Sequence, residues 1–160
     1  MKKIAYLSLG SNLGDRRANL RNAIGKLLSF GKLLAVSSFY ETEPVDFTEQ
    51  PWFLNCAVAL QTELQAEDFL AEIMAIEREM GRQRTQPKGP RTIDIDILLF
   101  GKATLQTPQL TLPHPAMHQR RFVLQPLAEI APDVQHPVLK KSIRELLKAL
   151  PKNAAKVRKA

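Results

Sequence analysis

The chain has little cysteine and no long apolar run, and both absences narrow its class. Its 160 residues include one cysteine, Cys56, within the apolar run LNCAVAL. A disulfide framework is therefore excluded, and a buried, unreactive thiol is expected. No apolar run approaches the length of a membrane-spanning helix, and the opening MKKIAYLSLGSN has too short an apolar part for a signal peptide. We expect a cytoplasmic protein with no membrane partner.

Common sequence signatures of nucleotide binding and nucleophilic catalysis are also absent. The chain contains neither GxxxxGK[ST] nor GxGxxG, so an ATP site would have to be built without the two commonest glycine-rich phosphate cradles. There is no G-x-S-x-G elbow and no cysteine in the setting of a nucleophile. Any chemistry must therefore come from other residue types.

Positive charge is concentrated at the C-terminus. The net charge is +7, and residues 140–160 hold eight Lys or Arg against one acid, Glu145. The length and composition predict a single domain over residues 1–150, followed by a basic, flexible tail over residues 151–160. A basic tail can contact nucleic acid, but a solvated tail that aids solubility is the preferred interpretation. The remaining mild positive charge suits a protein that binds anionic small molecules.

The order of periodic segments predicts an α+β fold. Alternating apolar residues predict strands at 2–10, 33–44, 52–63 and 92–100, and helical spacing predicts helices at 15–30 and 66–80. This order is that of a ferredoxin-like βαββαβ core, a mostly antiparallel sheet with helices packed on one face. C-terminal additions with short helices around 122–130 and 141–150 complete the expected structure.

Two aspartates occupy the most hydrophobic strand, RTIDIDILLF. Asp94 and Asp96 share one face because side chains alternate along a strand, and two strand rises place their Cα atoms about 6.6 Å apart. Such a pair can bind Mg²⁺, and Arg82, Arg84 and Arg91 nearby suit a metal-bound polyphosphate. The alternative is a solvated outer face of an edge strand, beside a loop that is merely solvated and mobile.

Three further features are candidates for ligand contacts. Glu77 falls at the spacing of the apolar helix face, where it can accept from a sugar hydroxyl or, as is commoner, point to water. Phe53 and Asn55 share a strand face suited to a heteroaromatic ligand, although a core Phe and a strand-end Asn explain them too. His114 lies between two prolines in extended chain. That setting disfavours a zinc site with His118 and favours a phosphate or ribose contact.

Several longer blocks carry a specific resemblance. They run from YLSLGSNLGD to FVLQPLAEIAPD and include SSFYETEPVDFTEQPWFLNCAVAL, IEREMGRQR, GPRTIDIDILLFG and LPHPAMHQRRFVLQPL. In content and spacing they resemble the 6-hydroxymethyl-7,8-dihydropterin pyrophosphokinases of folate biosynthesis. The resemblance implies transfer of the terminal pyrophosphate of ATP to the pterin hydroxymethyl group, release of AMP, and two Mg²⁺ ions. It also implies a monomer that acts on small molecules and has no nucleic-acid partner.

The resemblance further implies a role for each matching residue. Catalysis is expected of Arg82, Arg91, Asp94 and Asp96, with both aspartates as metal ligands. The expected pterin contacts are Thr42, Val45, Phe53, Asn55, Asp94 and Phe122, with the two phenylalanine rings on either side of the pterin. The expected ATP contacts are Leu70, Glu77, Arg82, Arg84, Arg91, Ile97, Leu110, Thr111, His114 and Arg120.

The chain departs from the family at a few positions, and two other classes remain as alternatives. Lys88 and Pro115 stand where aromatic residues are common in the family, and Phe53 stands where some members have tyrosine. Closure of the short loop TQPKG and one adenosine contact are therefore expected to differ. One alternative is an RNA-binding ferredoxin-like module, which the two aspartates disfavour. The other is a metal-dependent nucleotide hydrolase that needs no pterin.

Overall fold

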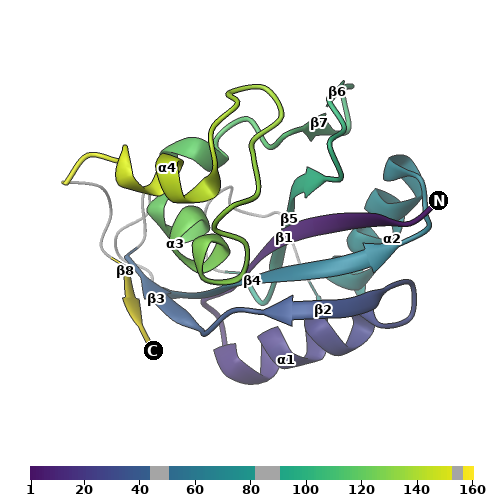
Figure 1. The fold of residues 1–160 in the computed structure, drawn as a ribbon. Helices are drawn as coiled ribbons and strands as arrows, with labels where there is room; N and C mark the ends of the chain where they lie inside the picture. Colours follow the sequence, from purple (N-terminus) through teal and green to yellow (C-terminus); the bar gives the residue numbers. More distant parts are fainter. Residues whose placement is uncertain (44–50, 82–90, 153–156) are drawn as a thin grey trace.

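One antiparallel sheet forms the centre of the fold (Figure 1). The computed structural model describes residues 1–43, 51–81, 91–152 and 157–160. The sheet has the order β5-β1-β4-β3-β8, with β2 also paired to β4, and all of these pairings are antiparallel. Its strands are β1 (Lys3–Ser11), β2 (Lys32–Val36), β3 (Tyr40–Thr42), β4 (Phe53–Thr62), β5 (Asp94–Phe100) and β8 (Val157–Lys159). A separate small hairpin joins β6 (Leu105–Gln106) to β7 (Thr111–Leu112).

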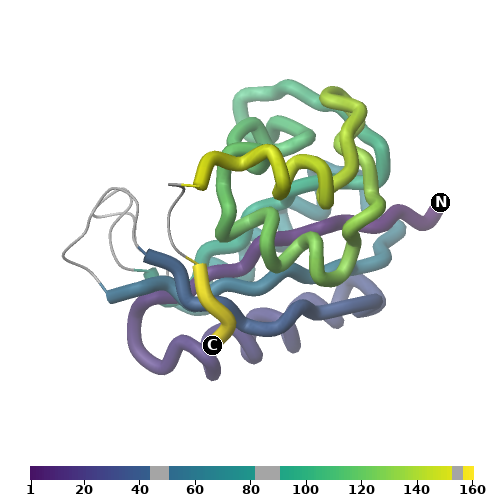
Figure 2. The backbone as a smooth tube through the Cα atoms, turned by 60° about the vertical axis from the view of Figure 1, so that its left-hand side comes forward, coloured from purple at the N-terminus to yellow at the C-terminus, as the bar shows by residue number. Residues whose placement is uncertain are grey.

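Helices cover both faces of the sheet, as Figures 1 and 2 show. Helices α1 (Arg16–Leu27) and α2 (Ala66–Glu79) pack on one face, where Phe69 and Leu20 join the inward residues of β1 and β4. On the other face, α3 (Arg121–Ile130) and α4 (Ile143–Lys148) bury Val123 and Leu146 against Leu98 of β5, with the short 3₁₀ helix η1 (Met117–Gln119) beside them. The expected antiparallel α+β architecture is confirmed, but the sequence pattern placed helices on one face only.

Local sequence signals explain where the helices begin. The Asp15 carboxylate accepts the Ala18 N–H and caps α1, and Ser142 and Glu145 form a reciprocal capping box at α4. Helix α2 buries Phe69, Ile73 and other residues at three- and four-residue spacing. Among the described residues, no helix is long and apolar enough to cross a membrane.

Three segments refine or depart from the sequence-based expectations. The strand expected at 33–44 divides into β2 and β3, because Ser37 bonds Ala57 through both its backbone N–H and its Oγ. Cys56 is buried as expected, and burial raises the pKa of its thiol to about 12. Within the C-terminal segment, residues 157–159 form β8 and pair with β3.

Candidate active site

A row of polar residues crosses three strands on the sheet face that lies under α3. Gly10 of β1 pairs with Asn55 of β4 on one side and with Asp94 of β5 on the other. Two residues earlier in β1, Ser8 pairs in the same way with Ala57 of β4 and Asp96 of β5. Adjacent strands lie about 4.8 Å apart. The side chains of Asn55 and Asp94 therefore lie on either side of Gly10, which has no side chain to fill the space between them. We call Asn55, Gly10, Asp94, Ser8 and Asp96 the polar row.

The carboxylates of Asp94 and Asp96 lie at the start of β5, as the alternation of the strand predicts. Both residues are partly exposed, whereas Ile95 and Ile97 between and beyond them are buried in the core on the α1/α2 side. Arg91 Nη1 lies 3.2 Å from Asp94 Oδ2. The strand is thus fixed by its apolar side chains, while its carboxylates remain accessible on the opposite face.

The donor set at this end of the row fits Mg²⁺. Hard carboxylate oxygens are the ligands that this ion prefers, and protein sites commonly supply only one or two carboxylates besides substrate phosphates and water. Within the described part of the chain, no group of three or more His, Cys, Asp or Glu is placed to hold a metal. Asp94 and Asp96 therefore suit a metal that arrives with a phosphate substrate better than an all-protein metal centre.

Asn12 fixes the position of Arg91, and sequence reasoning missed it. Its side chain is 1% exposed. Its Oδ1 accepts the Arg91 N–H at 2.8 Å, its own N–H donates to the Arg91 carbonyl at 3.1 Å, and its Nδ2 donates to the Pro51 carbonyl at 3.1 Å. One buried amide therefore joins the segments before β4 and β5. Asn12 belongs to the motif LGSN, but no local pattern in that motif indicates that Asn12 anchors Arg91.

The other end of the polar row holds a buried amide in a fixed orientation. Asn55 Nδ2 donates to Thr42 Oγ1 at 2.7 Å, and both side chains are buried. This bond fixes the amide plane of Asn55, which lies in the same strand as Phe53 and on the same face. Phe122 is the second residue of α3, and the Arg120 guanidinium lies 5.5 Å from the centre of the Phe122 ring.

Gly10 is a second residue that sequence reasoning missed. A Cβ atom built there would lie 2.6 Å from Asn55 Oδ1 and 3.3 Å from Phe53 Cδ1. Glycine within a strand often marks a place where another group approaches the backbone closely. Here that group is the Asn55 amide, so the absence of a side chain at Gly10 lets the amide lie flat over β1.

Glu77 binds the strand that carries the two aspartates. It is 6% exposed, and its Oε2 accepts the Ile95 N–H at 2.9 Å. Because β5 is the edge strand of the sheet, an N–H on its outer side has no strand partner, and α2 supplies the acceptor through Glu77. Its carboxylate thus lies at the backbone between Asp94 and Asp96.

The residues expected to contact the nucleotide gather at the outer side of β5. Ile97, Leu70 and Leu110 belong to one apolar cluster, and Thr111 begins β7. The His114 N–H donates to the Leu98 carbonyl at 2.9 Å, and His114 Nδ1 accepts the Ala116 N–H at 3.1 Å. Since Nδ1 accepts, a neutral His114 presents Nε2–H as a donor.

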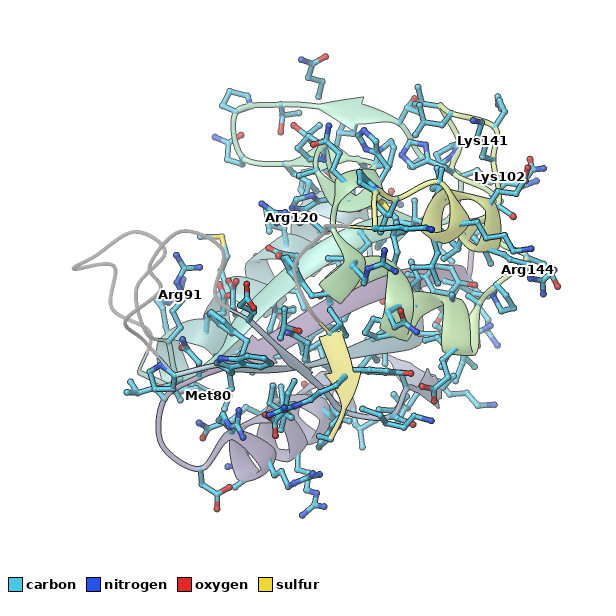
Figure 3. All side chains as sticks on the ribbon, turned by 90° about the vertical axis from the view of Figure 1, so that its left-hand side faces the viewer. Met80, Arg91, Lys102, Arg120, Lys141 and Arg144 are labelled. Carbon is cyan, nitrogen blue, oxygen red and sulfur yellow. The ribbon has the colours of Figure 1, made fainter. Side chains whose placement is uncertain are left out.

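The electrostatic surroundings favour that neutral form of His114. Burial lowers the pKa of His114, and Arg120 lowers it further, while Asp94 acts in the opposite direction. In Figure 3, Arg91 lies on the left of the molecule, Lys102, Lys141 and Arg144 lie on the right, and Arg120 lies between them. Val45, Arg82, Arg84 and Lys88, four positions named from the sequence, lie outside the described residues.

Comparison with known proteins assigns the family. The family model described as 7,8-dihydro-6-hydroxymethylpterin-pyrophosphokinase (HPPK) matches residues 6–132. The chain belongs to the HPPK family. This membership confirms the resemblance found in the sequence blocks. The HPPK match ends before α4 and β8, so the last 28 residues, 133–160, lie beyond the family model.

Curated relatives support the HPPK assignment over most of the chain. A 2-amino-4-hydroxy-6-hydroxymethyldihydropteridine pyrophosphokinase of Bacillus subtilis is 47% identical over 137 residues, 84% of this chain and 82% of the relative. A protein of the same name from Porphyromonas gingivalis is 51% identical over 134 residues, 81% of this chain and 91% of the relative. The chain spans only 21% of a third relative, the folic acid synthesis protein fol1 of Schizosaccharomyces pombe, at 41% identity over 93% of this chain.

Solved structures support the HPPK fold. A chain described as HPPK-DHPS in complex with substrates superposes with a TM-score of 0.73 at 17% identity, covering 93% of this chain and 43% of that chain. A Plasmodium falciparum HPPK-DHPS with STZ-DHP gives a TM-score of 0.73 at 18% identity, covering 92% and 45%. The chain thus spans less than half of these solved chains, and the likeness concerns the fold alone.

Proposed function

We propose that this chain transfers pyrophosphate from ATP to the hydroxymethyl group of 6-hydroxymethyl-7,8-dihydropterin, a step of folate biosynthesis. The products are the pterin diphosphate and AMP. The observation that carries the proposal is the polar row of an HPPK-family chain. Asn55 and its Thr42 partner lie on one side of Gly10, and Asp94 and Asp96 lie on the other. The end of the row that suits a flat, hydrogen-bonding ring thus adjoins the end that suits Mg²⁺ and phosphate.

The pterin is assigned to the Asn55 end of the row. Asn55 Nδ2 is engaged by Thr42, so Oδ1 remains to accept N–H groups from the pterin edge. Phe53 and Phe122 are assigned to the two faces of the ring, where offset stacking is favourable. Backbone groups near Thr42 and Val45 would bond the rest of the pterin edge.

The phosphates are assigned to the Asp94–Asp96 end, with two Mg²⁺ ions. Asp94 and Asp96 would hold the ions and Asp94 would also adjoin the pterin. Bound Mg²⁺ there would offset phosphate charge and lower the pKa of the attacking hydroxyl. Arg91, held by Asn12, is already oriented toward this end and can bind transferring oxygens with its planar fork.

The other ATP contacts follow from the residues around β5. Guanidinium groups of Arg82, Arg84 and Arg120 and the Nε2–H of His114 are assigned to phosphate or ribose oxygens. Leu70, Ile97, Leu110 and Thr111 are assigned to the adenosine, and Glu77 to its ribose. Such a site catalyses mainly by holding the hydroxyl and the β-phosphorus in line and by neutralising charge, with no covalent intermediate.

We also propose the finer architecture that the sequence pattern suggested. The strand order β5-β1-β4 with β2 and β3 beyond β4 supports a ferredoxin-like βαββαβ core with C-terminal additions. Residues 1–150 would form one pyrophosphokinase domain. The protein would act as a monomer in the cytoplasm.

An assay of AMP release tests this function. The protein is incubated with ATP and Mg²⁺, with and without 6-hydroxymethyl-7,8-dihydropterin, and AMP and pterin diphosphate are quantified. We expect AMP and the diphosphate in equal amounts, only when the pterin is present. ATP loss without pterin would identify a nucleotide hydrolase instead. RNA binding with steep salt dependence and no ATP turnover would identify a nucleic-acid module.

A further inference from the structure

The C-terminal strand β8 lies beside the pterin end of the polar row. It pairs with β3 in the register Tyr40↔Lys159, Glu41↔Arg158 and Thr42↔Val157, and the Ala160 N–H donates to the Phe39 carbonyl at 2.8 Å. Figure 2 shows the yellow C-terminal segment lying along the blue β3 segment, at the edge of the sheet. Thr42, the partner of Asn55, therefore has β4 on one side and the C-terminal strand on the other.

Arg158 attaches β8 to both strands that carry pterin contacts. Its Nη2 lies 3.2 Å from Glu41 Oε2, and its guanidinium lies 4.7 Å from the centre of the Trp52 ring. Glu41 directly precedes Thr42, and Trp52 directly precedes Phe53. Arg16 of α1 contacts Glu41 and Trp52 as well. Its Nη2 lies 3.6 Å from Glu41 Oε1, and its Nη1 donates to the Trp52 carbonyl at 3.0 Å. The two cations thus join the start of β4 to β3.

On the other face of the sheet, α3 holds β3 through Glu129. Its carboxylate accepts the Tyr40 hydroxyl at 2.5 Å, and the Ser38 N–H and hydroxyl at 2.9 and 3.0 Å. The Lys159 ammonium is near enough to help lower the pKa of Glu129. Phe122 lies seven residues before Glu129, two turns away on the same side of α3. The β8 strand therefore completes a set of contacts around β3 that also includes the helix carrying Phe122.

We propose that β8 is a positioning segment for the pterin substrate. The inference rests on the proposed function and concerns residues beyond the family model. Without β8, β3 would be a three-residue edge strand, and short edge strands lose their backbone order readily because half of their ladder is unpaired. The Thr42–Asn55 pair would then be less well ordered, and the pterin would have to order it on binding.

The test compares a chain that ends after Lys156 with two point variants in the full-length protein. Arg158→Ala removes the contacts with Glu41 and Trp52, and Arg144→Ala is the control because it removes the same charge from an exposed pair with Asp133. We expect the KM for pterin to rise about tenfold in the shortened chain and about threefold in Arg158→Ala. The KM for ATP should stay within about twofold in both, and Arg144→Ala should match the wild type.

Two further readouts separate positioning from plain stabilisation. Trp52 is the single tryptophan, so its fluorescence reports loss of the Arg158 contact in the shortened chain without any activity. Arg158→Lys keeps a cation for Glu41 but loses the planar contact with the ring, and it should fall between Arg158→Ala and the wild type. A shortened chain that melts earlier but keeps the wild-type KM for pterin, measured well below its Tm, would overturn the proposal.

The outcomes also distinguish this inference from the proposed function. If the wild type releases no AMP in the presence of pterin, the proposed function fails, and pterin affinity is then measured by calorimetry with Mg²⁺ and a non-hydrolysable ATP analogue. Weaker binding by the shortened chain would still support β8 as a positioning segment. Equal pterin affinity in the two chains, or no measurable binding by either, would overturn the inference.

Discussion

Replacing Gly10 by alanine should damage the pterin end of the site by displacing Asn55. The added Cβ would lie 2.6 Å from Asn55 Oδ1 and 3.3 Å from Phe53 Cδ1, whereas non-bonded heavy atoms prefer about 3.5 Å or more. The Asn55 amide must therefore move by most of an ångström or β1 must shift. Either movement disturbs the 2.7 Å bond from Asn55 Nδ2 to Thr42 Oγ1, which has little room to adjust because both residues are buried.

The magnitude follows from that buried hydrogen bond. Leaving a buried polar group unsatisfied costs about 1–3 kcal/mol, and each 1.4 kcal/mol corresponds to about a tenfold change in affinity. We therefore expect the KM for pterin to rise by about 10- to 100-fold in Gly10→Ala. The KM for ATP should change little, because the added methyl group lies against the pterin side of the row. The Tm should fall by several degrees, since overpacking costs about 1–3 kcal/mol.

Steady-state kinetics with each substrate varied in turn would measure this effect. Gly25→Ala is the matched control, because nothing lies within 4 Å of a Cβ at that position in α1. It should keep wild-type kinetics and gain about 0.5–1 kcal/mol of stability, as alanine is the better helix former. If Gly10→Ala kept the KM for pterin within twofold of the wild type, the role given to the Gly10–Asn55 approach would be refuted.

Three other predictions concern the carboxylates. Asp94→Asn and Asp96→Asn should each lower kcat at least about 100-fold. Near wild-type kcat at saturating Mg²⁺ would contradict the metal assignment. Glu77→Leu should cost about 1–3 kcal/mol of unfolding free energy, because it leaves the Ile95 N–H unpaired. Glu77→Gln keeps an acceptor for that N–H and should keep most of the stability. Equal Tm values for the two variants would contradict this. For Glu129, burial alone would raise the pKa, but hydrogen bonds from Tyr40 and Ser38 outweigh it and lower the pKa. Its stabilising contribution is therefore present above the ordinary carboxyl pKa and is lost as pH falls through the folded-state pKa, so the Tm advantage of the wild type over Glu129→Gln should shrink as the pH is lowered from neutral to below 4.5. A constant difference across that range would contradict the account.

The strands and the two long helices could be predicted from the sequence because their residues alternate or recur regularly. Asp94 and Asp96 were placed on one face by the period of the strand alone, and the buried Cys56 followed from its apolar run. The short helices around 122–130 and 141–150 were expected, but the sheet face that they cover was not, because the face is set by how the long connection after β5 folds back and not by a local pattern. The break at Ser37 depends on a contact with Ala57 across the sheet, which no local pattern reveals.

The site was predictable where residue chemistry is distinctive, and it was not where the role depends on space or distant contacts. Phe53 and Asn55 could be paired from alternation, whereas the importance of Gly10 depends on its register with Asn55. Asn12 acts through backbone atoms of Arg91, 79 positions away in sequence. The tail gave only a composition of basic residues, and its pairing with β3 is a long-range event. Such contacts are set by topology, not by local propensity.

The central claim is that one face of the sheet brings a pterin and an ATP phosphate together at the polar row. Its most direct test is the rate of AMP formation from ATP and Mg²⁺ with and without 6-hydroxymethyl-7,8-dihydropterin. The account predicts AMP and pterin diphosphate in a 1:1 ratio, strictly dependent on the pterin and abolished by Asp96→Asn. AMP formation that proceeds without pterin, or no AMP from folded protein with both substrates and Mg²⁺ present, would contradict it.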